Sequence, residues 1–325
     1  MLFKRILKGR SVLYIVAVCS ALLLSACEAK LDLEKVEAEK KATTVRFDQF
    51  QSVAQSLTHT VVVGAGGTIL VSEDNGGQWQ RSYVGDGSLT KHPLFIDVAA
   101  CPDQRFVALD VARRIWFSDQ NAQNWSAMPI ATEEEVLDLT CDPSNRVWVV
   151  GSFTLITMTD DDGANWQDLS VMDDAMFTRI QFLDAQNAVI VGEFGFVYAT
   201  SDGGETWEAR EPVPNEFYSQ SGYFRTPEEG WVVGLQGRIL HTSDGGQSWQ
   251  YQDTSTNAPI YNVAEIHGQV FAVGNNNTLM RLNGGQWQNF GDIQHYGYLR
   301  GITALPNGKM LVAGGGGSLH VVELN

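Results

Sequence analysis

The sequence predicts an all-β protein, a seven-bladed β-propeller of four-stranded antiparallel blades, from two repeating features. Tryptophan recurs at intervals of about 40 residues, and this period with several short strands per unit is typical of propeller blades. Seven short apolar segments end at glycine or, in one unit, at aspartate, as expected for strands buried on both faces. The segments are 61–64, 106–110, 147–151, 189–192, 231–234, 271–274 and 311–314, and the tryptophans are Trp79, Trp125, Trp166, Trp207, Trp249 and Trp287.

Each unit is interpreted as four strands in chain order. In the third unit, the predicted strands cover 137–141, 147–151, 155–159 and 166–170. The seventh unit lacks a fourth strand, so residues 43–48 are predicted to supply an N-terminal strand that completes the last blade. Closing the ring in this way removes the free sheet edges that promote aggregation.

The first 42 residues read as an export and anchoring segment. Residues 1–26 predict a lipoprotein signal peptide, because basic residues precede an apolar stretch that ends in Leu-Ser-Ala-Cys. This ending resembles a bacterial lipobox, which implies lipidation of Cys27, a tether over 27–42 and a propeller over 43–325. The alternatives are an ordinary secretory signal and an uncleaved N-terminal helix. Glu28 favours an anchor in the outer membrane, facing the periplasm, over one in the inner membrane.

Charge and cysteine content narrow the classes of partner and cofactor. A formal net charge of −16 argues against nucleic acid as a partner. Cys101 and Cys141 occupy equivalent places in consecutive units, and an oxidising compartment permits their pairing. A disulfide requires Cα atoms within about 7 Å, so the sequence leaves this bond open. No cofactor and no metal are expected: no Cys/His spacing fits zinc, and residues 160–162 lack the later glutamate of a calcium loop.

A polar phrase with the pattern [Ser/Thr]-x-Asp-x-Gly-x-x-Trp precedes four of the predicted outer strands. Its carboxylate and hydroxyl groups bond to amides within their own turn, its glycine permits a positive φ, and its tryptophan fills apolar space. We interpret the phrase as a folding element between the third and fourth strands. The residues concerned are Asp74, Trp79, Asp161, Trp166, Asp202, Trp207, Asp244 and Trp249.

This phrase resembles the Asp-box, or bacterial neuraminidase repeat. The longer pattern, in which an apolar strand ending in glycine and a short third strand precede the box, is similar to the photosystem II assembly/stability factor family over about 45–325. The resemblance implies a non-catalytic seven-bladed propeller that binds photosystem II subunit precursors, with relatives in bacteria that do not photosynthesise. The chain departs from the photosynthetic pattern through its negative charge and its lack of a concentrated arginine patch.

We therefore expect a non-enzymatic interaction or assembly factor in the cell envelope. Its partner is expected to be an envelope or membrane protein, and the chain itself a monomer held at the membrane by its lipid anchor. One alternative is an accessory lipoprotein of an outer-membrane assembly or transport complex. A second is a carbohydrate-active enzyme of the sialidase or glucanase type, although the only phrase near a sialidase arginine motif, 224–227, reads as a strand end.

Aromatic residues in the loops are the candidates for a partner-binding face. Such residues dominate the binding energy of protein interfaces, but they equally serve to fill the spaces between loops. Farther in, Ser52, Asp97, Asp138, Arg179 and Asn262 are expected to line a central channel, with an ion pair between Asp138 and Arg179. The aromatic and histidine candidates are Phe153, Phe194, Phe217, Tyr218, Tyr223, His295, Tyr296 and Tyr298.

Overall fold

The computed structural model describes residues 42–85, 92–291, 293 and 297–324. From Thr43 onward, these residues belong to one compact unit. The expected signal peptide, Cys27 and nearly all of the tether lie outside the described residues and remain predictions. Within the described ranges, no helix is long and apolar enough to span a membrane.

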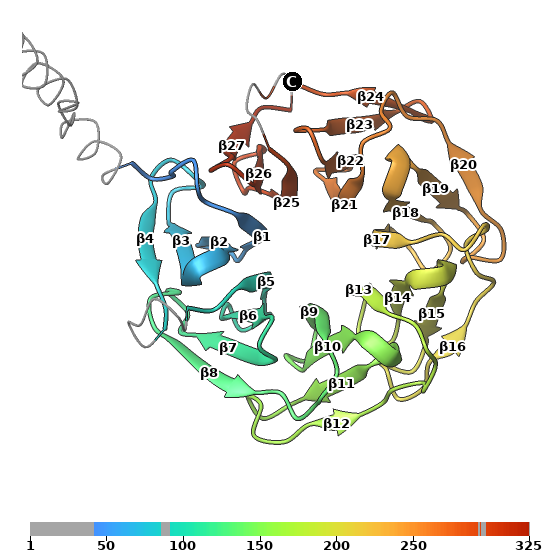
Figure 1. Cartoon of the computed structure of the whole chain (residues 1–325), viewed down its shortest axis with the longest axis horizontal. Helices are drawn as coiled ribbons and strands as arrows, with labels where there is room; N and C mark the ends of the chain where they lie inside the picture. Colours follow the sequence, from blue (N-terminus) through green and yellow to red (C-terminus); the bar gives the residue numbers. More distant parts are fainter. Residues whose placement is uncertain (1–41, 86–91, 292, 294–296, 325) are drawn as a thin grey trace, which may run out of the picture. The chain divides into compact units, whose positions relative to one another are not determined.

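Seven antiparallel sheets follow one another along the chain and stand as blades around a central axis (Figure 1). Within each blade the strands lie outward from the axis in chain order, which confirms the predicted propeller. Blades 1 to 4 comprise β1 (Phe50–Gln55), β2 (Thr60–Gly64), β3 (Thr68–Ser72), β4 (Gln80–Tyr83); β5 (Phe95–Ala100), β6 (Phe106–Asp110), β7 (Arg114–Ser118), β8 (Trp125–Pro129); β9 (Val136–Cys141), β10 (Val147–Gly151), β11 (Ile156–Thr159), β12 (Gln167–Asp168); and β13 (Phe177–Phe182), β14 (Ala188–Gly192), β15 (Val197–Thr200), β16 (Glu208–Ala209). Blades 5 to 7 comprise β17 (Ser219–Phe224), β18 (Gly230–Gly234), β19 (Ile239–Thr242), β20 (Gln250–Gln252); β21 (Ile260–Ile266), β22 (Gln269–Gly274), β23 (Leu279–Asn283), β24 (Gln286–Asn289); and β25 (Leu299–Ala304), β26 (Met310–Gly314), β27 (Leu319–Val322).

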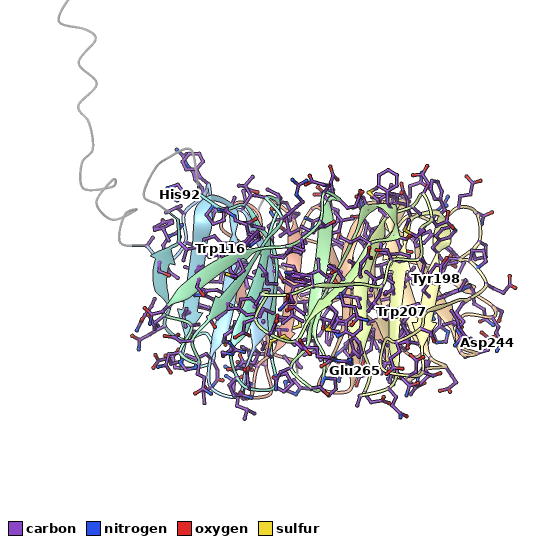
Figure 2. The ribbon with its side chains drawn as sticks, turned by 90° about the horizontal axis from the view of Figure 1, so that it is seen from below. His92, Trp116, Tyr198, Trp207, Asp244 and Glu265 are labelled. Carbon is purple, nitrogen blue, oxygen red and sulfur yellow. A yellow bond between two sulfur atoms is a disulfide. The ribbon has the colours of Figure 1, made fainter. Side chains whose placement is uncertain are left out.

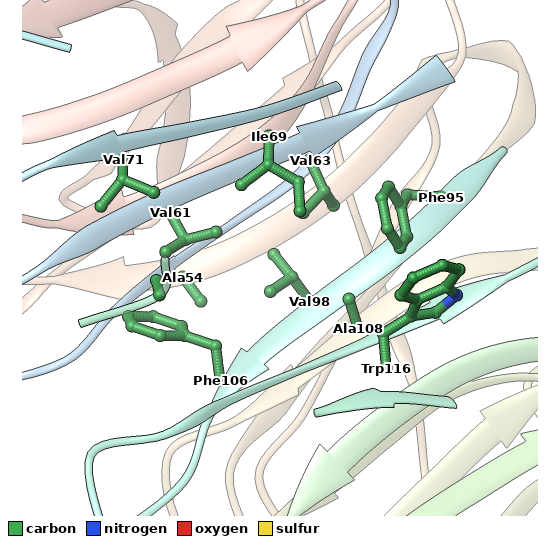
Figure 3. Packing of buried hydrophobic residues seen from close by; sticks show 11 residues of the cluster. Ala54, Val61, Val63, Ile69, Val71, Phe95, Val98, Phe106, Ala108 and Trp116 are labelled. Carbon is green, nitrogen blue, oxygen red and sulfur yellow. The ribbon is translucent and has the colours of Figure 1, made fainter. Parts of the chain in front are cut away.

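Among the described residues, the core consists of seven apolar clusters, each between two neighbouring blades. Between blades 1 and 2, Val61 and Val63 of β2 face Phe95 of β5 and Ala108 of β6 (Figure 3). The second strand of blades 1 to 5 and of blade 7 is buried along its whole length. Full burial of one Val, Leu or Ile side chain contributes about 1.5–3 kcal/mol, so these continuous apolar strands hold the blades together.

Ring closure differs from the expectation. Residues 43–48 form bends and a turn, and the described part of blade 7 has three strands. The Asp48 carboxylate accounts for the turn, because it accepts a hydrogen bond from the backbone N–H of Val45 at 2.8 Å and two from the Arg81 guanidinium. The ring closes instead through packing of β1 and β2 on β26, with a backbone bridge between Gln49 and Gly315.

The propeller has two faces with different connections. The connecting-loop face carries the turns between second and third strands and the segments that lead from each blade to the next. Four of these turns are short 3-10 helices, η1 (Ala65–Gly67), η2 (Ser152–Thr154), η3 (Glu193–Gly195) and η4 (Leu235–Gly237). The opposite, Asp-box face carries the Asp-box turns and the turns between first and second strands. Figure 2 shows His92 at the first face and Asp244 and Glu265 at the second.

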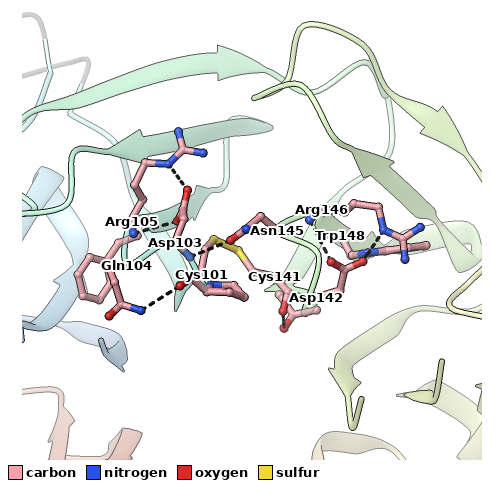
Figure 4. The surroundings of a disulfide bond; sticks show 12 residues. Cys101, Asp103, Gln104, Arg105, Cys141, Asp142, Asn145, Arg146 and Trp148 are labelled. Carbon is pink, nitrogen blue, oxygen red and sulfur yellow. Dashed lines mark hydrogen bonds and ion pairs between the residues drawn. A yellow bond between two sulfur atoms is a disulfide. The ribbon is translucent and has the colours of Figure 1, made fainter. Parts of the chain in front are cut away.

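A disulfide joins blades 2 and 3 on the Asp-box face. Cys101 follows β5, Cys141 ends β9, and their Cα atoms lie 5.2 Å apart, within the range for a disulfide. Nearby, the Asn145 side chain accepts a hydrogen bond from the backbone N–H of Asp103 at 2.9 Å (Figure 4). The bond that the sequence left open is therefore formed.

Candidate partner-binding face

The Asp-box carboxylates are engaged within their own turns. Asp202 accepts hydrogen bonds from the Thr200 hydroxyl at 2.6 Å and from the Thr206 backbone N–H at 3.0 Å, and these bonds hold the pKa of Asp202 far below its usual value. In the same way, bonds from Ser248 and Thr242 lower the pKa of Asp244 to about 2. With their acceptor sites occupied, these groups maintain the turn.

Each Asp-box also contacts the preceding blade. Trp207 of blade 4 lies against Trp148 of blade 3, with ring centroids 6.2 Å apart, and the Arg146 guanidinium of blade 3 donates to the Gly203 carbonyl at 2.8 Å. Trp79, Trp166 and Trp249 likewise join the apolar clusters between their own blade and the one before it. The box is thus a connector between blades as well as a turn.

The polar residues expected near the axis form a network between blades. The Asp97 carboxylate accepts from the Ser52 hydroxyl of blade 1 at 2.6 Å and from the Leu139 backbone N–H of blade 3 at 3.3 Å. Asp138 accepts from the Arg179 guanidinium at 3.0 Å, which confirms the expected ion pair, and from the Ile180 backbone N–H at 2.8 Å.

Burial sets the electrostatics of this network. Desolvation raises the pKa of Asp138 well above its usual range, and the positive charge of Arg179 opposes that shift. A cavity of about 210 Å³ lies beside the pair, and its lining includes Tyr218, Tyr261 and Arg300. Its described lining includes no histidine. No group of three or more His, Cys, Asp or Glu able to hold a metal occurs in the part of the chain that the structure describes.

The aromatic candidates divide into two sets. Phe153 and Phe194, at the middle of η2 and η3, are 57% and 46% exposed on the connecting-loop face. Tyr218 and Tyr298 are half-buried, Tyr218 at the channel cavity and Tyr298 hydrogen-bonded through its hydroxyl to Gln51. His295 and Tyr296 lie outside the described residues.

Two candidates are placed differently from the expectation. Phe217 is 5% exposed and fills space in the cluster between blades 4 and 5. Tyr223 belongs to β17 rather than to a loop and stacks on Trp231 near the Asp-box end of that strand. Burial and the nearby Glu265 raise its pKa to about 12. Packing explains both placements, because Phe217 and Tyr223 each contact apolar side chains at an interface between blades.

The sequence reasoning missed that exposed apolar residues recur at equivalent turns of four consecutive blades. Val111, Phe153, Phe194 and Leu235 lie in the connecting turns of blades 2 to 5, and we call them the apolar arc. The corresponding turns of blades 6, 7 and 1 read Asn275-Asn276-Asn277, Gly315-Gly316-Gly317 and Ala65-Gly66-Gly67. Aligning the seven turns in the sequence places these residues at two adjacent positions: Val111 and Leu235 are the first residue after the second strand, and Phe153 and Phe194 are the second.

Two members of the arc occupy an unfavourable backbone conformation. Phe153 and Phe194 have φ of 51° and 56°, in the left-handed region where bulky residues are rare. The equivalent residues of blades 1 and 6 are Gly66 and Asn276, residue types that tolerate this region. A left-handed conformation at a residue other than glycine costs on the order of 1–3 kcal/mol. Exposure and strain together indicate that these phenylalanines serve something other than folding.

A family model described as photosynthesis system II assembly factor YCF48 matches residues 97–198 and 164–286, which together cover more than half of the chain. The chain belongs to this family. This match confirms the resemblance inferred from the repeats. The chain is a propeller similar to an assembly or interaction factor. No curated protein sequence matches it.

Solved structures show the same fold at low identity. YCF48 from Cyanidioschyzon merolae is 17% identical, with 87% of this chain and 97% of that chain covered at a TM-score of 0.69. A structure described as YCF48 bound to D1 peptide is 16% identical, with 87% and 94% covered at a TM-score of 0.71. A streptogramin B lyase is 12% identical, with 86% and 95% covered at a TM-score of 0.73. The fold alone therefore does not separate binding proteins from enzymes.

Proposed function

We propose that this chain is a non-catalytic factor that binds a segment of a partner protein on its connecting-loop face. The apolar arc of blades 2 to 5 carries this proposal, because exposed apolar side chains gathered on one face are typical of protein-binding sites. Membership of the family supports it, as does the relative described as bound to a D1 peptide. The partner is proposed to be an envelope or membrane protein, either a photosystem subunit precursor or a component of an outer-membrane assembly or transport complex.

The test compares partner capture from gently solubilised membranes by the intact chain and by a Phe153→Asn/Phe194→Asn variant. Asparagine is chosen because Asn276 already occupies the equivalent place in blade 6 at a φ of 54°. Leu57→Ser is the matched control, since Leu57 is 78% exposed on the Asp-box face. We expect a specific co-purifying protein to be lost with the double variant and kept with the control. Equal recovery with all three chains would contradict the proposal.

We further propose that the chain acts in the cell envelope as a lipoprotein anchored through Cys27, in the outer membrane and facing the periplasm. The Cys101–Cys141 bond supports an exported location, because disulfides persist in oxidising compartments and are rare in the cytosol. Labelling with a palmitate analogue tests the anchor. The wild type should take up label and sediment with outer membranes, whereas Cys27→Ser should lose both properties.

Enzymatic activity is the second candidate, and the channel cavity is the feature that favours it. Arginines, tyrosines and the carboxylates Asp97 and Asp138 line it, and a raised pKa such as that of Asp138 suits a general acid. Against this, both carboxylates already accept hydrogen bonds from neighbouring blades. We expect no hydrolysis of chromogenic sialosides or β-glucans. If the wild type hydrolyses one of these substrates and Asp138→Asn does not, the chain is an enzyme instead.

A further inference from the structure

A groove in the connecting-loop face of blade 3 combines apolar and acidic residues. It lies between the segment that leads into β9 and the segment that leads from β12 to β13. Phe153 and Met172 contribute exposed apolar surface, with Met172 86% exposed, and the buried Leu155 also lines the groove. The groove continues the apolar arc, so a partner on the arc has access to it.

Carboxylates border this apolar surface on both sides. Glu133 and Glu134 lie on the segment before β9, Asp168 is on β12, and Asp173 and Asp174 lie on the segment after it. Hydrogen bonds from the Ser170 hydroxyl and backbone N–H lower the pKa of Asp168. That carboxylate therefore stays ionised at neutral pH.

Some of this negative charge is already used within the chain. The Arg113 guanidinium lies 3.5 Å from a Glu133 carboxylate oxygen and donates to the Glu133 backbone carbonyl at 2.8 Å. Glu134 accepts from the Ser152 hydroxyl at 3.1 Å, and Asp173 accepts from the Asp174 backbone N–H at 2.9 Å. The groove is bordered by five carboxylates, and in the described structure the cation that contacts them is Arg113. The groove is therefore strongly negative.

We propose that this groove binds an extended, cationic segment of the partner protein, in which apolar side chains alternate with lysine or arginine. This inference rests on the proposed function and specifies the chemistry of the partner. Apolar side chains would cover Phe153 and Met172 while the cations meet the bordering carboxylates. An anionic lipid surface or a second copy of this chain, with its charge of −16, would be repelled by the same groups.

The probe for this inference is a fluorescein-labelled peptide of alternating lysine and leucine, measured by anisotropy against the intact chain in detergent. The same peptide with glutamate in place of lysine is the charge control. We expect the lysine peptide to bind and the glutamate peptide not to bind. Asp173→Asn/Asp174→Asn should weaken binding about 5- to 10-fold, the effect of two partly exposed ion pairs, and should reduce its dependence on salt.

Matched variants exclude simple attraction to an acidic protein. Glu205→Gln/Glu228→Gln removes the same charge from exposed positions on the Asp-box face, and Leu57→Ser removes an exposed leucine there. Both should bind the lysine peptide like the wild type, whereas Met172→Ser should weaken binding several-fold. Equal affinity for both peptides, or equal losses in the groove and control variants, would overturn the inference.

Partner capture with the same variants separates this inference from the proposed function. If Phe153→Asn/Phe194→Asn loses the partner and Asp173→Asn/Asp174→Asn keeps it at wild-type recovery, the chain binds a partner but not through a cationic segment. If both variants lose the partner and both controls keep it, the inference is supported. If neither variant loses it, the proposed binding face is wrong as well.

Discussion

The two faces of the propeller use the same repeat in opposite ways. On the Asp-box face, polar side chains close their own turns, as Asp202 does with Thr200, and the box tryptophans cover the preceding blade. On the connecting-loop face, turns of blades 2 to 5 expose apolar side chains where other blades have glycine, alanine or asparagine. The comparison teaches that the repeated side chains of the Asp-box phrase stabilise the fold on one face. On the connecting-loop face, by contrast, stability of the fold does not explain the exposed apolar residues.

Removal of the disulfide should give the largest change in stability, and it tests whether the Asp-box face stabilises the fold. Cys101→Ser/Cys141→Ser removes a cross-link between residues 40 apart in the chain, which should lower the free energy of unfolding by roughly 4 kcal/mol. Urea unfolding measures this. A reductant should produce a similar loss in the wild type and none in the variant; an unchanged wild-type midpoint would show that the bond adds nothing to stability.

Alanine substitution of one glycine on each face compares how much stability the two kinds of turn lose. Gly204 has a φ of +89°, and an added Cβ would clash with the buried Trp148 ring, so Gly204→Ala should cost about 3 kcal/mol. Gly66→Ala, on the other face, has a φ of +70° and nothing within 4 Å of the added atom. It should cost only about 1 kcal/mol. Equal losses in urea unfolding would remove the distinction between the faces.

Relief of backbone strain tests the connecting-loop face. Phe153→Asn should raise the free energy of unfolding by about 1 kcal/mol, because asparagine tolerates a φ of 51° better than phenylalanine does. The reverse change in blade 6, Asn276→Phe, should lower stability by a similar amount. Calorimetric midpoints of the two variants should therefore move in opposite directions; a loss in Phe153→Asn would mean that the phenylalanine supports the fold.

The smallest expected effect is the pH dependence of one Asp-box. Asp244 has a pKa of about 2 in the folded chain against a usual value of 3.8. A lowered folded-state pKa means that its stabilising contribution is present above about pH 4 and is lost as pH falls toward 2. Over that window, the urea midpoint of the wild type should fall slightly more than that of Asp244→Asn. Parallel curves would show that the box bonds do not favour the ionised form.

Much of this protein could be predicted from its repeats. The continuous apolar run at 61–64 became a buried second strand, and the Asp-box turns appeared where the phrase predicted them. The channel pair Asp138–Arg179 was predicted because equivalent positions of adjacent blades meet near the axis. The strand expected at 43–48 was not found, since Asp48 closes a local turn on Val45, and Arg81, 33 residues farther along the chain, binds the same carboxylate.

The sequence by itself determined the number of blades, the order of their strands and the Asp-box turns, because these depend on local hydrogen bonding and on a burial pattern repeated in every unit. Only the tertiary structure decided which aromatic side chains are exposed. Phe153 and Phe217 look alike as loop residues, yet one is open to solvent and the other fills a blade interface. The pairing of Cys101 with Cys141 was also decided there. In each case the outcome depends on distances between neighbouring blades, which packing sets and which no single repeat contains.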